Sequence, residues 1–452
     1  MQGPRLANGR DASYSARGRG CGGSRVPVGV HAMTQHEVRH ETPADVGSPS
    51  GEAQAILDTI DPFAASDGAR FEALLATLRD QCPVAHLGGG THLVTRHDDV
   101  LSVLRDVQAF GNSHCARAPG VRVPPEDRLI FAEYDPPEHG PLRQLFIDLL
   151  SRGRSEGHTE LIRTTATGLL GPLLADGRGE LVADLAAPLG GRVMMEIIGL
   201  PVDDWHRHLE WMGAMSVSGF MATNRTDAGV GYAACFPEVV DYFDAALAER
   251  EALPDPPDDV LTRIVQARLD GAPLSQTHRR MVLLSLIFGG VNTIVHLFGN
   301  LLQTLIEQPE VLEALRADRA LVPVAVEESL RRDSPVMFLT RVCTRDTEVA
   351  GQPVQAGERV MLHLLSANRD ERVYAEPERF RLDRDEAAHV ALGWGAHWCL
   401  GAAIARALAT TLVDTVLDRV DTMTFEPGFV PEPYSSGVSH APAELRARLT
   451  AR

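Results

Sequence analysis

The sequence predicts a single large, mainly helical domain with small β-sheets. Apolar residues recur at three- and four-residue spacing over most of the chain, which is typical of amphipathic helices. Segments that alternate between polar and apolar residues are short and few, such as residues 92–95, which predict a strand. The composition does not change abruptly after residue 50, so we expect one domain over residues 46–452.

Residues 1–45 are predicted to form a disordered N-terminal tail. The first 32 residues carry Arg5, Arg10, Arg17, Arg19 and Arg25 among glycines and serines. They lack the continuous apolar stretch of a signal peptide, and they hold too few apolar residues to form a core. Met33 is an alternative start of the natural protein.

Helical spacing predicts the main elements in chain order. The predicted helices span residues 97–106, 141–150, 160–170, 182–198, 236–251, 281–306, 322–332, and from 400 or 401 to about 419. The most apolar of them, 281–306, contains three glycines together with Asn292, Thr293, His296 and Asn300. A membrane-spanning helix rarely tolerates such polar residues, so we expect a buried core helix and no membrane anchor.

Charge and cysteine content exclude several classes of protein. The formal net charge is -18, which disfavours nucleic-acid binding because that needs a strongly basic surface. The six cysteines are scattered without a Cys-x-x-Cys pair, which argues against a disulfide framework or a zinc knuckle and favours reduced thiols in a cytoplasmic protein. The chain contains no lysine, from which we infer a GC-rich bacterial genome as its origin.

Residues 392–401 contain the most informative cysteine. Gly393 and Gly395 permit positive φ angles and a tight loop, and a helix beginning directly afterwards places its positive end beside Cys399. These features stabilise a sulfur anion, which an iron ligand must be. A lone cysteine is more often a buried inert residue, so the surrounding spacing carries the interpretation.

That spacing, Gly-x-Gly-x-His-x-Cys-x-Gly, followed by Ala405 and Arg406, resembles the haem-binding loop of the cytochromes P-450. The resemblance implies haem b with Cys399 as its axial ligand and Gly401 allowing close approach of the haem. It extends over roughly residues 55–452. One departure is Leu392, where the family usually has a phenylalanine that shields the sulfur, so we expect an altered redox potential but intact ligation.

Two further segments resemble the family. Residues 326–331 resemble its ExxR helix, and residues 377–380 resemble its PERF segment. The resemblance assigns Glu328, Arg331 and Arg379 to a buried structural network, although spacing alone would suggest an ordinary surface ion pair. It also assigns the haem propionates to four residues, with the first two on one helix face and the third on a strand: His139, Arg143, Arg341 and His397.

On the predicted core helix, two adjacent glycines precede Asn292 and Thr293. Each interior glycine costs about 1 kcal/mol, which suggests that something must fit against the backbone. The resemblance places dioxygen and substrate here, with Thr293 orienting water and protons, although such a threonine often only bonds the carbonyl four residues earlier. Most of the family has an acid where this chain has Asn292, and an amide cannot relay protons by ionising.

The same resemblance predicts the substrate pocket. Its lining residues would be Ser285, Phe288, Gly289, Val336, Met337 and Phe338, with further candidates in residues 110–134, 212–221 and 436–438. These residues are mostly apolar, so the predicted substrate is a small or medium, largely apolar organic molecule.

The predicted function is that of a monomeric bacterial monooxygenase of secondary metabolism. It would take electrons from a separate ferredoxin and ferredoxin reductase, since the chain resembles no flavin or iron–sulfur module, and Arg143 and Arg406 would attract an acidic ferredoxin. The alternative suggested by Asn292 is diverted chemistry: peroxide-driven oxidation, oxidative coupling or group transfer. A haem sensor without turnover is the third hypothesis, and the complete set of motifs argues against it.

Overall fold

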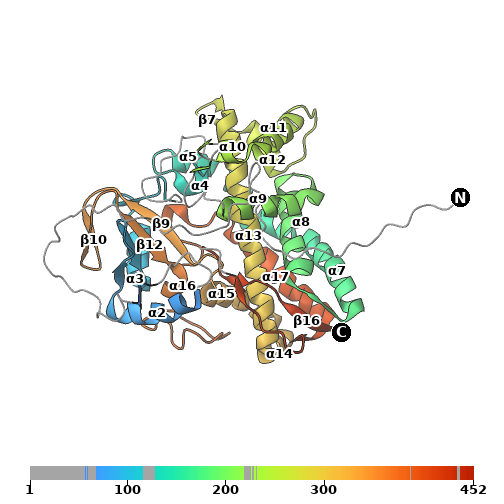
Figure 1. The fold of residues 1–452 in the computed structure, drawn as a ribbon. Coiled ribbons are helices and arrows are strands. Elements are labelled where there is room, and N and C mark those ends of the chain that lie inside the picture. The colour runs from blue at the N-terminus through green and yellow to red at the C-terminus, as the bar shows by residue number, and fades with distance from the viewer. Residues whose placement is uncertain are drawn as a thin grey trace. The chain divides into compact units, whose positions relative to one another are not determined.

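The computed structural model describes residues 56–57, 59, 68–115, 128–217, 225–226, 229–230, 232–386, 388–434 and 438–452. The predicted tail, residues 1–45, lies outside the described residues. The helices are α2 (Gly68–Gln81), α3 (His97–Arg105), α4 (Ile130–Glu133), α5 (His139–Gln144), α6 (Arg152–Gly157), α7 (Thr159–Asp176), α8 (Ala187–Ile198), α9 (Trp205–Val217), α10 (Tyr232–Cys235), α11 (Pro237–Glu251), α12 (Val260–Gln266), α13 (Gln276–Glu307), α14 (Pro309–Ala317), α15 (Val322–Arg332), α16 (Leu364–Ala367) and α17 (Ala402–Arg419). Helices dominate, as predicted (Figure 1).

The strands are short. They are β1 (Val84–His86), β2 (Thr91–Val94), β3 (Phe110–Gly111), β4 (Arg178–Glu180), β5 (Arg225–Thr226), β6 (Gly229–Val230), β7 (Arg268–Leu269), β8 (Ala272–Pro273), β9 (Phe338–Cys343), β10 (Thr347–Val349), β11 (Gln352–Val354), β12 (Arg359–His363), β13 (Val420–Phe425), β14 (Pro433–Tyr434), β15 (Ala441–Pro442) and β16 (Arg446–Ala451). The largest sheet has the order β1-β2-β12-β9-β3, and only its β2–β12 pair is parallel. β12 is the middle strand in this order, and every one of its residues is buried.

The long helix α13 runs through the helical part of the fold (Figure 1). Its N-cap Ser275 accepts a hydrogen bond from the His278 amide, which satisfies one of the first backbone donors. Among the described residues it is the helix long and apolar enough to cross a membrane, and more than half of its most apolar stretch is buried against the rest of the protein. This burial is what a core helix requires, and the sequence predicted a core helix here.

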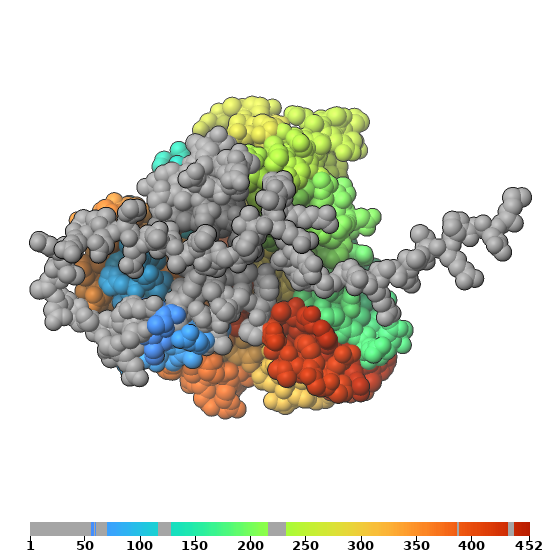
Figure 2. All heavy atoms as spheres, in the orientation of Figure 1, coloured from blue at the N-terminus to red at the C-terminus, as the bar shows by residue number. Residues whose placement is uncertain are grey.

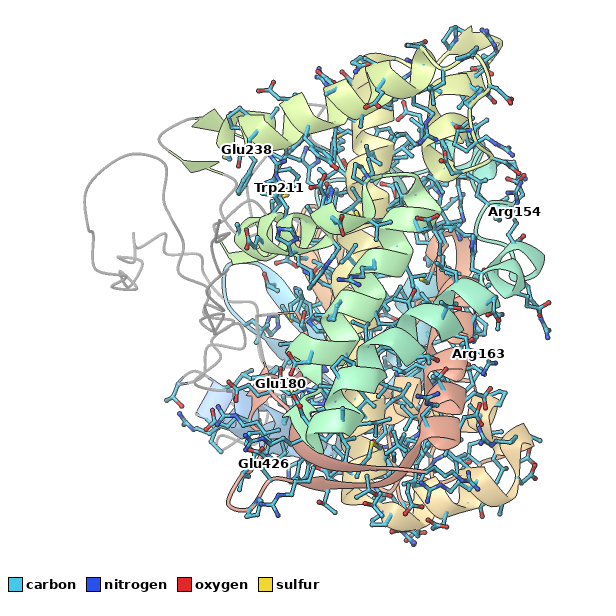
Figure 3. All side chains as sticks on the ribbon, turned by 90° about the vertical axis from the view of Figure 1, so that its right-hand side faces the viewer. Arg154, Arg163, Glu180, Trp211, Glu238 and Glu426 are labelled. Atoms are coloured by element: carbon cyan, nitrogen blue, oxygen red, sulfur yellow. The ribbon has the colours of Figure 1, made fainter. Side chains whose placement is uncertain are left out.

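A second sheet has the order β13-β16-β4, so it pairs two C-terminal strands with the short strand that follows α7. In the space-filling view this red C-terminal region lies beside the green-blue residues of α7 (Figure 2), and β16 contacts that helix. On the same side of the molecule Arg154 of α6 pairs with Asp258 at 2.8 Å, and Arg163 of α7 lies 3.6 Å from Asp418 of α17 (Figure 3). Such exposed pairs contribute little, so apolar packing holds these helices together.

Several predicted helices differ from the observed ones, and two are longer than expected: α7 extends to Asp176 and α13 begins at Gln276. The helix expected over 141–150 ends at Gln144, because the following amides bond carbonyls three residues back and turn Phe146 and Leu149 into the core. The helix expected over 182–198 begins with one π-helical turn, Val182–Ala186, before α8. The last helix begins at Ala402, with Gly401 as its N-cap residue.

Candidate active site

The loop before α17 holds Cys399 as the sequence predicted. Gly393 has φ 70° and Gly395 has φ 69°, and both values lie in the left-handed region that favours glycine. The Cys399 amide donates to the Leu392 carbonyl at 2.8 Å and closes the loop. A Cβ atom at Gly401 would lie 3.9 Å from the Cys399 sulfur, so glycine keeps the space beside the sulfur open.

Burial and the neighbouring polar groups act in opposite directions on the pKa of the Cys399 thiol. Burial raises the pKa of its thiol, while a hydrogen bond from the Gly401 amide and the charges of Arg143 and Arg406 lower it. The Arg143 guanidinium donates to the Trp398 carbonyl, directly before the cysteine. A thiolate bound to a cation would gain from all three groups.

Two predicted histidines stack on each other near this loop. The rings of His139, the first residue of α5, and His397 lie 4.0 Å apart between centroids at an interplanar angle of 25°. Burial, with added contributions from His139 and Arg341, lowers the pKa of His397 to about 4. The Nε2 atoms of both histidines are buried and make no hydrogen bond within the part of the chain that the structure describes.

Arg341 lies on β9, opposite Val360 of β12. Its side chain is buried, and burial lowers the pKa of its guanidinium. It donates to the Thr340 carbonyl at 2.9 Å and forms no ion pair among the described residues. A buried arginine without a carboxylate partner is unfavourable, so the site is suited to an anionic group that the protein itself does not supply.

These residues fit a haem. Two buried ring nitrogens and one buried guanidinium need hydrogen-bond acceptors, and the propionates of a haem would supply them. A half-buried cysteine beside a helix N-terminus supplies a thiolate ligand of the kind that haem iron accepts. The sequence reasoning identified all of these residues but not the Trp398 and Leu392 carbonyls, which no sequence signal marks.

Arg406 differs from its predicted role. Its guanidinium forms two hydrogen bonds with Glu327, at 2.6 and 2.8 Å, and these bonds raise the pKa of Arg406. Although burial raises it, the bonds from Arg406 and His389 lower the pKa of Glu327 to about 2. Because its charge is neutralised by Glu327, Arg406 is not the free cation that was expected to attract a ferredoxin.

The two glycines on α13 serve different purposes. A Cβ atom at Gly290 would lie 2.8 Å from the Met194 side chain of α8, whereas one at Gly289 would meet nothing within 4 Å. Gly290 therefore allows helix packing, and Gly289 faces open space. The Thr293 hydroxyl donates to the Gly289 carbonyl at 2.6 Å, and Asn292 is half-buried beside it.

The predicted pocket residues fall into two groups. Phe288 and Val336 are half-buried, and Ser285 is committed elsewhere: its hydroxyl donates to the Met281 carbonyl and accepts from the Ile130 amide, which fixes α4 on α13. Met337 and Phe338 are buried in a cluster with residues of α2, and their lining role stays a prediction. Residues 116–127, 218–221 and 436–437 of the other candidate segments lie outside the described residues.

The buried structural network is only partly the predicted one. Arg331 forms two 2.8 Å bonds with Glu328, and both side chains are 3% exposed. The Arg379 side chain is 69% exposed and pairs with Glu376, so its assignment to the network is wrong. Arg384 takes its place, since its side chain is 8% exposed and binds Glu328 at 2.7 Å. Only the Arg379 carbonyl belongs to the network, as an acceptor from both buried arginines.

Comparison with known proteins agrees with this site. Residues 224–438 match the family model for cytochrome P-450. The chain is 33% identical over 356 residues to the erythromycin C-12 hydroxylase of Saccharopolyspora erythraea, covering 78% of this chain and 87% of that protein. It is 30% identical over 358 residues to the steroid C26-monooxygenase of Mycobacterium tuberculosis (strain H37Rv), covering 79% and 87%.

Solved structures show the same fold. A mutant of the P-450 EryK in complex with erythromycin B matches with a TM-score of 0.76 and 30% identity, over 85% of this chain and 97% of that one. The chain therefore belongs to the cytochrome P-450 family. It is an oxidoreductase of the monooxygenase kind, with the haem-thiolate cofactor of that family.

Proposed function

We propose that this monooxygenase inserts one oxygen atom of dioxygen into a medium-sized, largely apolar organic molecule. Two features carry the proposal: the Cys399 loop with its basic residues, and the open space at Gly289 beside the Thr293 hydroxyl. Two relatives are named as an erythromycin hydroxylase and a steroid monooxygenase, which supports an organic molecule of this size class as the substrate. The half-buried Phe288 and Val336 suit such a surface.

The haem would be held by an iron ligand, by residues that bind its propionates and by a neighbouring positive charge. Cys399 would ligate the iron, and Gly401 would keep the neighbouring space clear. Arg341, His139 and His397 would bind the propionates, and Arg143 would add positive charge next to the loop. When bound, the haem supplies the oxidation chemistry, and the protein supplies binding, orientation and protons.

The residues that would supply protons beside Gly289 of α13 are unusual for this family. Thr293 holds its hydroxyl on the Gly289 carbonyl, which leaves its oxygen free to accept from a water molecule. Asn292 can hold a second water through its amide, but it cannot take up or release a proton near neutral pH. Proton delivery to this region therefore has to come from another group.

Electrons would come from a separate ferredoxin and its reductase, in a bacterial cytoplasm. Arg143 is a cation beside the cysteine loop that forms no ion pair among the described residues, so it would contribute to attracting an acidic donor. Diverted chemistry remains the second candidate, and Asn292 is the observation that favours it.

A binding and turnover experiment tests the proposal. Erythromycin B and testosterone serve as probes of the two ring systems, and binding of either should shift the absorption of the ferric haem. Product should then form with ferredoxin, reductase and dioxygen. Product formed with hydrogen peroxide alone, and none with the reductase system, would favour the diverted chemistry instead.

A further inference from the structure

A line of polar residues runs along the otherwise apolar helix α13. Asn292, His296, Asn300 and Thr304 follow one another at intervals of four, so each lies about one turn, ~5.4 Å, beyond the last on the same face. Asn292, Thr293 and His296 are half-buried, whereas their neighbours Ile294, Val295 and Leu297 are buried. The polar line therefore follows the face of α13 that also carries Gly289 and its open space.

The far end of this line reaches a cavity open to solvent. The Asn300 side chain donates to the Asp333 carbonyl at 2.6 Å and to the His440 carbonyl at 3.0 Å. Beside them lies a cavity of about 110 Å³, which is large enough to hold water. Its walls are formed by Asn300, Gln303, Arg332, Asp333, Pro431, Glu432, His440 and Ala441.

Titratable groups connect this cavity with the middle of α13. His440 Nδ1 lies 3.2 Å from a carboxylate oxygen of Glu72 on α2. Although burial raises it, the hydrogen bond with His440 lowers the pKa of Glu72, and the charges of Arg369 and His363 add to this effect. Burial, together with the charge of the nearby His440, lowers the pKa of His296 to about 4. Asn300, one turn after His296 on α13, bonds the His440 carbonyl, so His440 packs against the same face of α13 as His296.

We propose that His296 relays protons from the cavity at His440 to the waters beside Asn292 and Thr293. The proposal rests on the monooxygenase function proposed above and names the group that replaces the acid missing at position 292. A neutral imidazole takes up a proton on one ring nitrogen as it releases one from the other, so one proton enters and one leaves without net charge or electron transfer. His440 lines the cavity, and its pair with Glu72 places a carboxylate at this end of the route.

Oxygen reduction without organic substrate tests the relay. When the holoenzyme consumes dioxygen with ferredoxin and reductase, poor proton delivery releases hydrogen peroxide, and good delivery yields water. His296→Gln should raise the ratio of peroxide to water by about tenfold or more, because positioned proton transfer contributes about 10²–10⁴-fold to rates. His97→Gln is the matched control, since His97 is a buried histidine on a different helix, α3, and it should behave as the unmodified enzyme.

Rescue separates a relay from a merely structural role. Asn292→Asp restores an acid one turn from His296, so the double variant Asn292→Asp, His296→Gln should return to the low peroxide ratio. An unchanged ratio in His296→Gln, or a high ratio that the aspartate does not lower, would overturn the proposal. An unmodified enzyme that consumes no dioxygen would instead remove the proposed monooxygenase function.

A spectroscopic measurement decides the geometry without turnover. Nitrogen NMR of histidine-labelled, carbon monoxide-bound ferrous enzyme gives the pKa of His296. Asn292→Asp should raise this pKa by about one unit or more, because an opposite charge one turn away favours the imidazolium. No shift would mean that position 292 and His296 do not face each other, and the relay would fail even if dioxygen is consumed.

Discussion

Replacing Arg384 by alanine removes the side chain that ties Glu328 to the segment after α16. The guanidinium of Arg384 makes five hydrogen bonds: to Glu328, to Glu386, and to the carbonyls of Ala375, Glu376 and Arg379. Its loss leaves the buried Glu328 carboxylate with less positive charge and removes one donor from each of these three carbonyls, of which the Arg379 carbonyl keeps its bond from Arg331. Removing one partner of a buried ion pair costs about 3–5 kcal/mol.

Arg379 provides the matched control five residues earlier. Its guanidinium pairs with Glu376, and both side chains are more than half exposed. Exposed pairs of this kind contribute about 0–1 kcal/mol, so Arg379→Ala should be nearly neutral. Guanidinium unfolding of the holoenzyme, followed by haem absorbance, should place the unfolding midpoint of Arg384→Ala well below that of Arg379→Ala. Equal destabilisation by the two substitutions would refute the assignment of Arg384 to the buried network.

Three other expectations concern haem binding, electron transfer and acid stability. His139→Phe and His397→Phe should each increase the rate of haem loss to an acceptor protein, since a hydrogen bond to a charged propionate contributes about 1.5–3 kcal/mol. Unchanged rates would mean that these two histidines do not bind the propionates. The rate of reduction by an acidic ferredoxin should fall with ionic strength and in Arg143→Ala, but much less in Arg406→Ala, because Glu327 already neutralises that cation. Burial lowers the pKa of His363 to about 3, so between about pH 6.5 and 3 the unfolded chain binds the extra proton and the free energy of unfolding falls as the pH falls. His363→Gln should reduce that slope by about 1.4 kcal/mol per pH unit, measured by urea unfolding at several pH values, and an unchanged slope would mean that His363 is protonated in the folded protein.

The sequence was most informative where function depends on local backbone. The glycines around Cys399 and the helix that follows are properties of neighbouring residues, so the loop, its positive φ angles and the sulfur environment could be predicted. Helix α15 begins and ends at the predicted residues, because Pro323 near its start and the apolar period of 322–332 are both local signals.

The sequence was least informative where a contact depends on the path of an irregular segment. Arg379 and Arg384 lie in the same turn-rich stretch, and which of them reaches Glu328 depends on how that stretch folds back over α15. Met337 and Phe338 were predicted on family position, whereas the packing of β9 on α2 decides where they point. The four-residue polar spacing on α13 is visible in the sequence, but Glu72 and His440 lie more than 140 residues from His296, and only the fold brings them near.

The most direct measurement concerns the iron ligand. Reduced enzyme with carbon monoxide should show the red-shifted Soret absorption of a thiolate-ligated haem, and Cys399→Ala should lose that band. Cys343→Ala is the matched control. Cys343 is a buried cysteine at the end of β9, where its thiol donates to the Arg345 carbonyl, and its substitution should leave the band in place. Persistence of the red-shifted band in Cys399→Ala would contradict the assignment of the haem site on which the proposed function rests.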